Sequence, residues 1–206
     1  MSLYEIRIAG YSRGIVCFLS LLLISVYMSA LEIGTGVANI TPDVTTYKVP
    51  MAGYGARMGR PSTGVHDALH AKVLYLIEGK KRIALITADL RSSTPEFKEQ
   101  IVNKTADLGM TLENLFLAAS HTHDGPSMYP EKFWQMQFGK YDPAIVDIMT
   151  TAIAKAIHEA ASSTQPARMG CAAMSSDGLT RNRRWGYDTD KREAAGESPV
   201  VEPRLT

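Results

Sequence analysis

Two histidines separated by one residue, His121 and His123, lie in the segment LFLAASHTHDGPSMY at residues 115–129. Neutral imidazoles at this spacing can share one metal ion, or one can bind the metal while the other transfers protons. In an extended chain both rings would point to the same side, because side chains alternate along it. A polar turn with a satisfied histidine is the alternative, and the local pattern leaves both interpretations open.

Further candidate side chains lie in two segments upstream of this pair. Asp89 ends the apolar run ITADL, where a carboxylate could ligate a metal or orient an imidazole, or could simply cap a turn. His66 and Asp67 in TGVHDAL could line a substrate cleft, although an Asx turn is the simpler alternative.

Arginines are concentrated in TRNRRW at residues 180–185. A guanidinium such as that of Arg183 could stabilise an oxyanion or hold a carboxylate. A solvated basic loop is the alternative interpretation of the same residues.

The sequence around these residues predicts alternating strands and helices. Apolar runs bounded by glycine, proline or polar residues predict strands, and stretches with helical periodicity and capping residues predict helices. We expect strands near residues 32–40, 71–79, 82–90, 114–120 and 167–174, and helices near 93–109 and 142–163.

This order favours an α/β fold with a mixed or parallel sheet and helices packed on it. The run RIALITADL is nearly all apolar, which predicts a strand covered on both faces. Ligand sites in such folds lie beyond the carboxyl ends of strands, and the two histidines follow a predicted strand directly. The glycine-rich stretch at residues 49–64 predicts a loop whose backbone can approach a neighbour closely.

The composition excludes several classes of protein. The 206 residues are 45% hydrophobic and 21% charged with a formal net charge of +1, values typical of a globular protein. No basic surface alternates with aromatic residues, so we expect no nucleic-acid partner. The two cysteines, Cys17 and Cys171, are too few for a disulfide framework or a cysteine zinc site.

The first thirty residues predict a signal peptide and therefore a secreted or periplasmic protein. Arg7 and Arg13 precede an apolar run at residues 15–28, and Ser29 and Ala30 follow it. The run is shorter than the about 20 residues that a membrane span requires. An uncleaved anchor and an untranslated upstream extension are the alternatives.

Five segments together resemble the neutral/alkaline, non-lysosomal ceramidases. They are GVANITP, MAGYG, TGVHDALHAKVLYL, ALITADL and ASHTHDGPSMY, in that order. The resemblance implies that residues 31–206 form the N-terminal portion of a larger catalytic domain. It also implies a zinc-dependent amidohydrolase that cleaves the N-acyl bond of ceramide to sphingosine and a fatty acid.

The resemblance also assigns roles to individual residues. His121 corresponds to a zinc ligand, His123 to the histidine beside the scissile amide, and Arg183 to an assisting arginine. From their positions in the sequence, we also expect the carboxylates of Asp89 and Asp124 to influence the histidines without contacting the metal. The family's other zinc ligands, a His, a Glu and a Tyr, lie farther along the sequence, so we expect the 206-residue chain to be inactive by itself.

The sequence departs from the family pattern after the second histidine. Asp124 replaces a common serine, and Ser127 and Met128 stand where a second glycine is common. These departures leave two alternatives open: a hydrolase of another amide or ester, and a non-catalytic secreted module. The expected partner is ceramide or another N-acyl lipid, with peripheral membrane contact and no protein partner implied.

Overall fold

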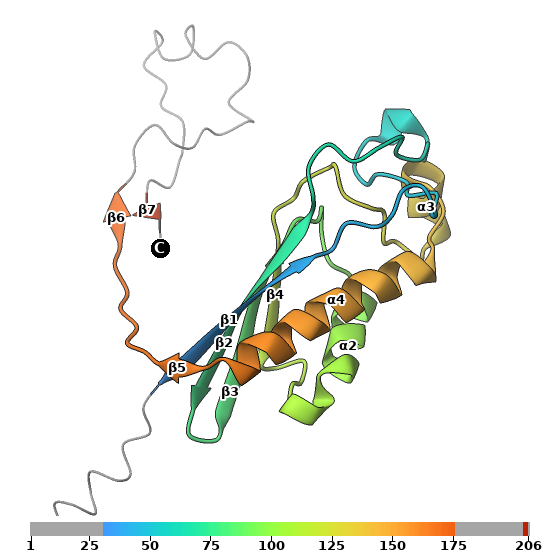
Figure 1. Cartoon of the computed structure of the whole chain (residues 1–206). Coiled ribbons are helices and arrows are strands. Elements are labelled where there is room, and N and C mark those ends of the chain that lie inside the picture. Colours follow the sequence, from blue (N-terminus) through green and yellow to red (C-terminus); the bar gives the residue numbers. More distant parts are fainter. Residues whose placement is uncertain (1–30, 176–203, 206) are drawn as a thin grey trace, which may run out of the picture. The chain divides into compact units, whose positions relative to one another are not determined.

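A computed structural model describes residues 31–175 and 204–205, and the chain divides into two compact units, Met1–Ala167 and Arg168–Thr206. The first unit contains a five-stranded sheet with the strand order β4-β3-β2-β1-β5 (Figure 1). Its strands are β1 (Glu32–Asn39), β2 (His70–Glu78), β3 (Lys81–Ala88), β4 (Leu115–Ala119) and β5 (Gln165–Pro166). Only β3 and β4 pair in parallel, so the sheet is mixed and the predicted α/β fold is confirmed.

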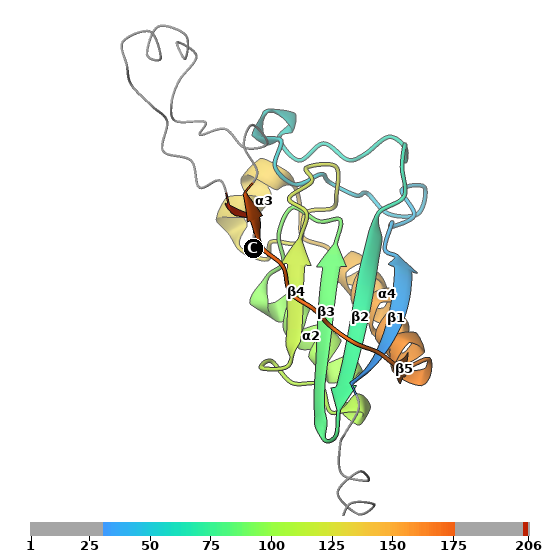
Figure 2. The same cartoon turned by 90° about the vertical axis from the view of Figure 1, so that its left-hand side faces the viewer.

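The helices α2 (Pro95–Lys104) and α4 (Pro143–Ser162) lie side by side on one face of the sheet (Figures 1 and 2). Both helices have a side-chain N-cap. The side chains of Thr94 and Asp142 accept hydrogen bonds from backbone N–H groups in the first turn of α2 and α4. The predicted helix at 93–109 ends earlier, at Lys104, and continues as the 3₁₀ helix η2 (Ala106–Leu108) before Gly109. The helix α3 (Lys132–Phe138) was not predicted.

Among the described residues no helix covers the opposite face of the sheet, so within this part of the chain the prediction that β3 is covered on both faces is wrong. Ala84, Ile86 and Ala88 point to the helices and are buried. Ile83 and Leu85 point to the other face and are 37% and 41% exposed. An apolar run cannot distinguish two covered faces from one covered face and one apolar, exposed face, because both have the same composition.

Two glycines of β1 allow α4 to pack directly on the strand backbone. A Cβ atom at Gly34 would lie 1.8 Å from the carbonyl oxygen of Ala160, and one at Gly36 would lie 2.2 Å from that of Ala156. Both glycines lie within β1, inside the segment where a strand was predicted. Their function there is close packing between strand and helix.

The second unit contains a two-stranded antiparallel ladder of β6 (Met174–Ser175) and β7 (Arg204–Leu205). The strand predicted at residues 167–174 is wrong except for Met174, since residues 167–173 are irregular. Cys171 is exposed with a free thiol. The predicted signal peptide and Arg183 lie outside the described residues. Within the described ranges, no helix combines the length and apolar character needed to cross a bilayer.

Candidate functional site

Three connecting segments meet at the end of the sheet where β1, β3 and β4 terminate. They are residues 40–69 after β1, residues 89–94 after β3 and residues 120–131 after β4, and Figure 2 shows them together with α3 at the upper end. Both histidines of the H-x-H pair are in the third segment. This is the edge at which ligand sites of α/β folds form.

The backbone of His121 is in the left-handed region, with φ of 62°. The extended conformation predicted for the H-x-H pair is therefore wrong at this residue. The backbone N–H of His121 donates to the carbonyl of Leu90 at 2.9 Å, and its Nδ1 lies 2.8 Å from the carbonyl oxygen of Arg91. Because a carbonyl only accepts, Nδ1 carries the proton, and Nε2 of the neutral ring keeps a free lone pair.

The imidazole of His123 lies beside that of His121. Their ring centroids are 5.2 Å apart in an edge-to-face arrangement, and Tyr54 contacts His123 similarly at 5.4 Å. The backbone of Gly53 also lies against this ring, since a Cβ atom at residue 53 would be 2.5 Å from Cγ of His123. The predicted close approach of the glycine-rich loop is therefore present, and the neighbour that its backbone approaches is His123.

Backbone pairing fixes the glycine-rich loop against the histidine loop. The N–H of Ala52 donates to the carbonyl of Gly125 at 3.0 Å, and the N–H of Ser127 donates to that of Pro50 at 2.8 Å. Met51 and Pro126 form an isolated antiparallel bridge between these bonds. The two loops therefore behave as a short ribbon that carries Gly53 and Tyr54 to His123.

The departures from the family pattern have different environments in the structure. Asp124 is exposed, and its carboxylate accepts a hydrogen bond of 3.3 Å from the hydroxyl of Tyr54. Ser127 and Met128 are buried, at 3% and 4% exposure, so their effect is on packing. Among these departures, Asp124 is the one placed where a ligand could meet it.

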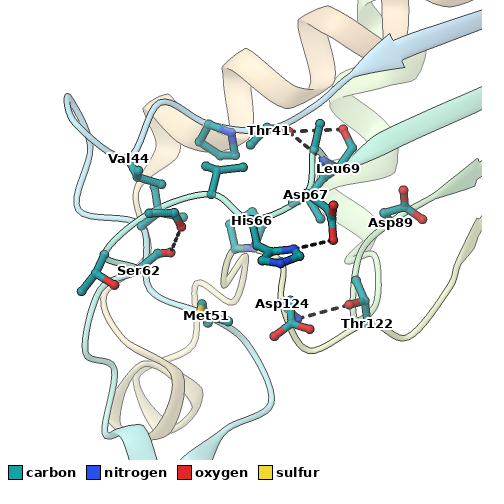
Figure 3. Close-up of a pocket in the computed structure, with 18 of the residues that line it drawn as sticks. Thr41, Val44, Met51, Ser62, His66, Asp67, Leu69, Asp89, Thr122 and Asp124 are labelled. Carbon is teal, nitrogen blue, oxygen red and sulfur yellow. Dashed lines mark hydrogen bonds and ion pairs between the residues drawn. The ribbon is translucent and has the colours of Figure 1, made fainter.

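A cavity of about 590 Å³ lies next to this loop (Figure 3). Val44, Val49 and Leu69 supply apolar lining, and His66, Asp67, Asp89, Thr122 and Asp124 supply polar groups. Thr122 and Asp124 alternate with the histidines along the loop. Among the described residues, neither imidazole lines the cavity, so the H-x-H pair and the cavity occupy adjacent sides of one loop.

His66 and Asp67 lie together at this cavity, with Nδ1 of the histidine 2.8 Å from the carboxylate (Figure 3). The hydrogen bond to Asp67, together with its negative charge, raises the pKa of His66 above its ordinary value. Both side chains are highly exposed, at 96% and 88%. The pair is thus accessible to a ligand entering the cavity.

Asp89 has a backbone partner in the structure. Its carboxylate accepts a hydrogen bond of 2.9 Å from the N–H of His70, which holds the start of β2 against the end of β3. This is the turn-stabilising role that sequence analysis left open beside a metal or imidazole role. The group that orients His121 is the carbonyl of Arg91.

The donor chemistry of this loop fits a metal site through one ligand, His121. Its ring is exposed, and in the neutral form with Nδ1–H bonded to the Arg91 carbonyl its Nε2 lone pair can bind a metal ion. Within residues 31–175 and 204–205, no group of three or more His, Cys, Asp or Glu side chains is arranged to hold a metal ion. A structural or catalytic zinc site needs at least three protein ligands, so the described residues do not form a complete one.

Comparison with known proteins agrees with the ordered motifs. The model of the family "Neutral/alkaline non-lysosomal ceramidase, N-terminal" matches residues 31–195. The chain belongs to this family. Among its relatives are the neutral ceramidase of Mycobacterium tuberculosis, 26% identical over 74% of this chain, and neutral ceramidase A of Dictyostelium discoideum, 32% identical over 68%.

Solved structures share the fold of this family member. A structure entitled "Ceramidase complexed with C2" has a TM-score of 0.68 and 21% identity over 85% of this chain, and neutral ceramidase from Pseudomonas aeruginosa has a TM-score of 0.60 and 18% identity over the same share. The chain covers 28% of each of these structures and 25% and 20% of the two curated relatives. It therefore spans about a quarter of the length of the proteins that it matches.

Several residues of the site were missed by sequence analysis. Tyr54 and Gly53 contact His123 from the glycine-rich loop, and Arg91 contacts His121 through its main chain. Arg91 follows the strand-end segment ITADL closely, so the strand-end rule that selected Asp89 could also have selected it. A contact made by a carbonyl leaves no signal in residue type, because every residue has one.

Proposed function

We propose that this chain carries part of the active site of a zinc-dependent ceramide amidohydrolase. Membership of the ceramidase family supports this proposal, as do the names of its relatives. The observation that carries it is the geometry of His121, whose Nδ1–H donates to Arg91 while Nε2 stays free beside a second imidazole. Metal-binding histidines commonly have this hydrogen bond on the nitrogen that does not bind.

The two histidines have different roles in this proposal. His121 holds zinc through Nε2, and the bound ion would polarise a carbonyl and lower the pKa of water to about 7. His123 does not ligate the metal but delivers a proton to the departing amine, which an imidazole can do near neutral pH. Arg183, outside the described residues, is the proposed partner of the oxyanion.

The remaining zinc ligands are proposed to come from residues other than those described. His121 is one ligand, and a catalytic zinc site uses three protein ligands or more together with water or substrate. The 206-residue chain is accordingly expected to be inactive alone. An activity assay therefore uses the complete translation product of the gene.

The cavity beside the histidine loop is the proposed place for part of the lipid substrate. Val44, Val49 and Leu69 offer apolar contact to a hydrocarbon chain, while His66 and Asp67 can hydrogen-bond polar groups at the rim. Asp124 lines the same cavity. Because it adds a negative charge, a smaller or more polar amide or an ester is the alternative substrate.

The location of the protein is part of the proposal. A signal peptide at residues 1–30 would direct it to the periplasm or the exterior, where it would meet ceramide at a membrane surface. N-terminal sequencing of the exported protein should begin near residue 31. A mature protein that starts at Met1 would contradict export by a cleaved signal.

A substrate panel tests the function. The complete translation product is assayed with ceramides of different acyl length, with N-acyl amino acids, with water-soluble amides and with the corresponding esters. We expect ceramide hydrolysis that stops on chelation and returns when zinc is added. Preference for a water-soluble amide or ester would contradict ceramide as the substrate, and activity that survives chelation would contradict the metal.

A further inference from the structure

The left-handed His121 is held by a segment that immediately follows β3. Ser120 N–H donates to Ala88 at 3.0 Å and His121 N–H donates to Leu90 at 2.9 Å, which extends the pairing of β3 and β4 past the strand ends. Leu90 is fully buried in the core. The carbonyls of Leu90 and Arg91 thus hold the backbone and the ring of His121 from two consecutive residues.

The side chain of Arg91 is anchored in an aromatic cluster formed by Tyr129, Trp134 and Phe138. Its guanidinium donates to the hydroxyl of Tyr129 and lies 5.7 Å from the centroid of that ring and 5.1 Å from that of Phe138. The hydroxyl of Tyr129 also forms a hydrogen bond with the hydroxyl of Ser92, the residue that follows Arg91. Both contacts fix the segment whose carbonyls hold His121.

The cluster itself is rigidly packed. Trp134 and Phe138, one turn apart on α3, stack with their rings 5.6 Å apart and 5° from parallel, and Tyr129 packs against both at 5.8 Å. Nε of Arg91 is buried and has no hydrogen-bond partner among the described residues. The polar anchoring of the guanidinium therefore depends on the Tyr129 hydroxyl.

From this arrangement we infer that Arg91 and Tyr129 are positioning residues that select the Nδ1–H tautomer of His121. The inference rests on the proposed function, in which Nε2 of His121 binds the metal. Tyr129 fixes the guanidinium of Arg91, the fixed side chain holds the Arg91 main chain, and the Arg91 carbonyl accepts the hydrogen bond from Nδ1–H of His121. Nε2 is then presented unprotonated before any metal arrives, so no tautomer change is needed on binding.

The tautomer can be measured directly in the metal-free 206-residue chain. Long-range ¹H–¹⁵N spectra of the histidine-labelled protein, at a pH where the rings are neutral, distinguish Nδ1–H from Nε2–H, and His121→Gln assigns the signal. Tyr129→Phe removes only the hydroxyl and keeps the ring in the cluster. Tyr141→Phe is the matched control, because Tyr141 is also partly buried against the core.

We expect His121 to be in the Nδ1–H form in the wild-type chain and in Tyr141→Phe. In Tyr129→Phe and Arg91→Met its signal should shift towards the Nε2–H form, and Arg91→Lys, which keeps a donor for Tyr129, should fall between. Backbone amide spectra show that each variant is folded. The inference is overturned if Tyr129→Phe and Arg91→Met match the control, or if the wild-type ring is in the Nε2–H form.

A zinc titration of the complete translation product separates this inference from the proposed function. If the tautomer responds as expected but zinc does not bind, the positioning role stands and the metal function fails. If zinc binds through His121 while the tautomer is indifferent to Tyr129 and Arg91, the metal function stands and the positioning role fails.

Discussion

The backbone of Gly53 lies against the imidazole of His123, so closely that a Cβ atom at residue 53 would be 2.5 Å from Cγ and 2.6 Å from Nδ1 of the ring. Gly53 also has φ of 98°, a conformation that residues with a side chain rarely adopt. The position of the proposed proton-transferring group is thus set by a residue 70 positions upstream in the sequence.

Replacing Gly53 by alanine should displace His123. The added methyl group overlaps the ring, and a displacement of about 1 Å at a catalytic group can lower kcat by about 100-fold. Ceramide hydrolysis by the complete translation product measures this effect, with Gly55→Ala as the control, because a Cβ atom at Gly55 meets no atom within 4 Å. Equal kcat values for the two variants would contradict the proposed role of His123.

Replacing Gly36 by alanine should destabilise the first unit. The new Cβ would lie 2.2 Å from the carbonyl oxygen of Ala156, so α4 has to move away from β1. Such overpacking costs about 1–3 kcal/mol of unfolding free energy. Urea denaturation followed by circular dichroism measures the change against Gly55→Ala. A variant as stable as the control would show that β1 and α4 are not in direct backbone contact.

The positions of strands and helices could be predicted from the sequence better than which faces of the strands the helices cover. Alternation could not be read in RIALITADL, because Ile83 and Leu85 on the open face are as apolar as Ile86 on the buried face. Residues on one face of β3 are buried because the helices pack on that face. The lengths of the connections do not determine which face the helices cover. The strand predicted at 167–174 was wrong for a related reason, since a short apolar run with no periodicity carries little information.

Adjacent residues of β3 allow a direct test of the one-sided packing. Ile86 is 2% exposed beneath the helices, so Ile86→Ala should lower the unfolding free energy by about 2–5 kcal/mol. Leu85 is 41% exposed on the other face, so Leu85→Ala should cost less than about 1 kcal/mol. Urea denaturation of both variants measures the difference, and equal losses would indicate that both faces are covered.

The pair of His158 and Asp107 should make stability depend on pH. The carbonyl of Ala154, which accepts from Nδ1, and the carboxylate of Asp107 raise the pKa of His158 above 6.5. The hydrogen bond from His158 lowers the pKa of Asp107 below 3.8. A raised histidine pKa stabilises the fold fully below 6.5, and this contribution is lost as the pH rises through the raised value.

The contribution of Asp107 has the opposite pH dependence. It is fully present above 3.8 and lost as the pH falls through the lowered pKa, so the pair stabilises the fold most between pH 3.8 and 6.5. His158→Gln should remove the loss of stability on the alkaline side of this window. Unfolding free energies at a series of pH values test this. An unchanged profile in the variant would assign the pH dependence to other groups.

Part of the candidate site was accessible from sequence and part was not. The histidine pair, Asp124 and the glycine-rich loop carry signals in residue type and spacing, and the structure brings Gly53 to His123. No signal in residue type or spacing predicts the left-handed backbone of His121 or its hydrogen bond to the Arg91 carbonyl. Both depend on how β3 and β4 end beside each other. The aromatic cluster on α3 was missed because the helix has seven residues, too few to show a clear period.

Zinc content measured alongside ceramide hydrolysis tests the central claim most directly. The complete translation product, His121→Ala and His123→Ala are purified identically and analysed for bound metal by mass spectrometry. If His121 ligates zinc and His123 transfers protons, the wild type and His123→Ala retain zinc, His121→Ala loses it, and both variants lose ceramide hydrolysis. Full zinc content and activity in His121→Ala would contradict the account.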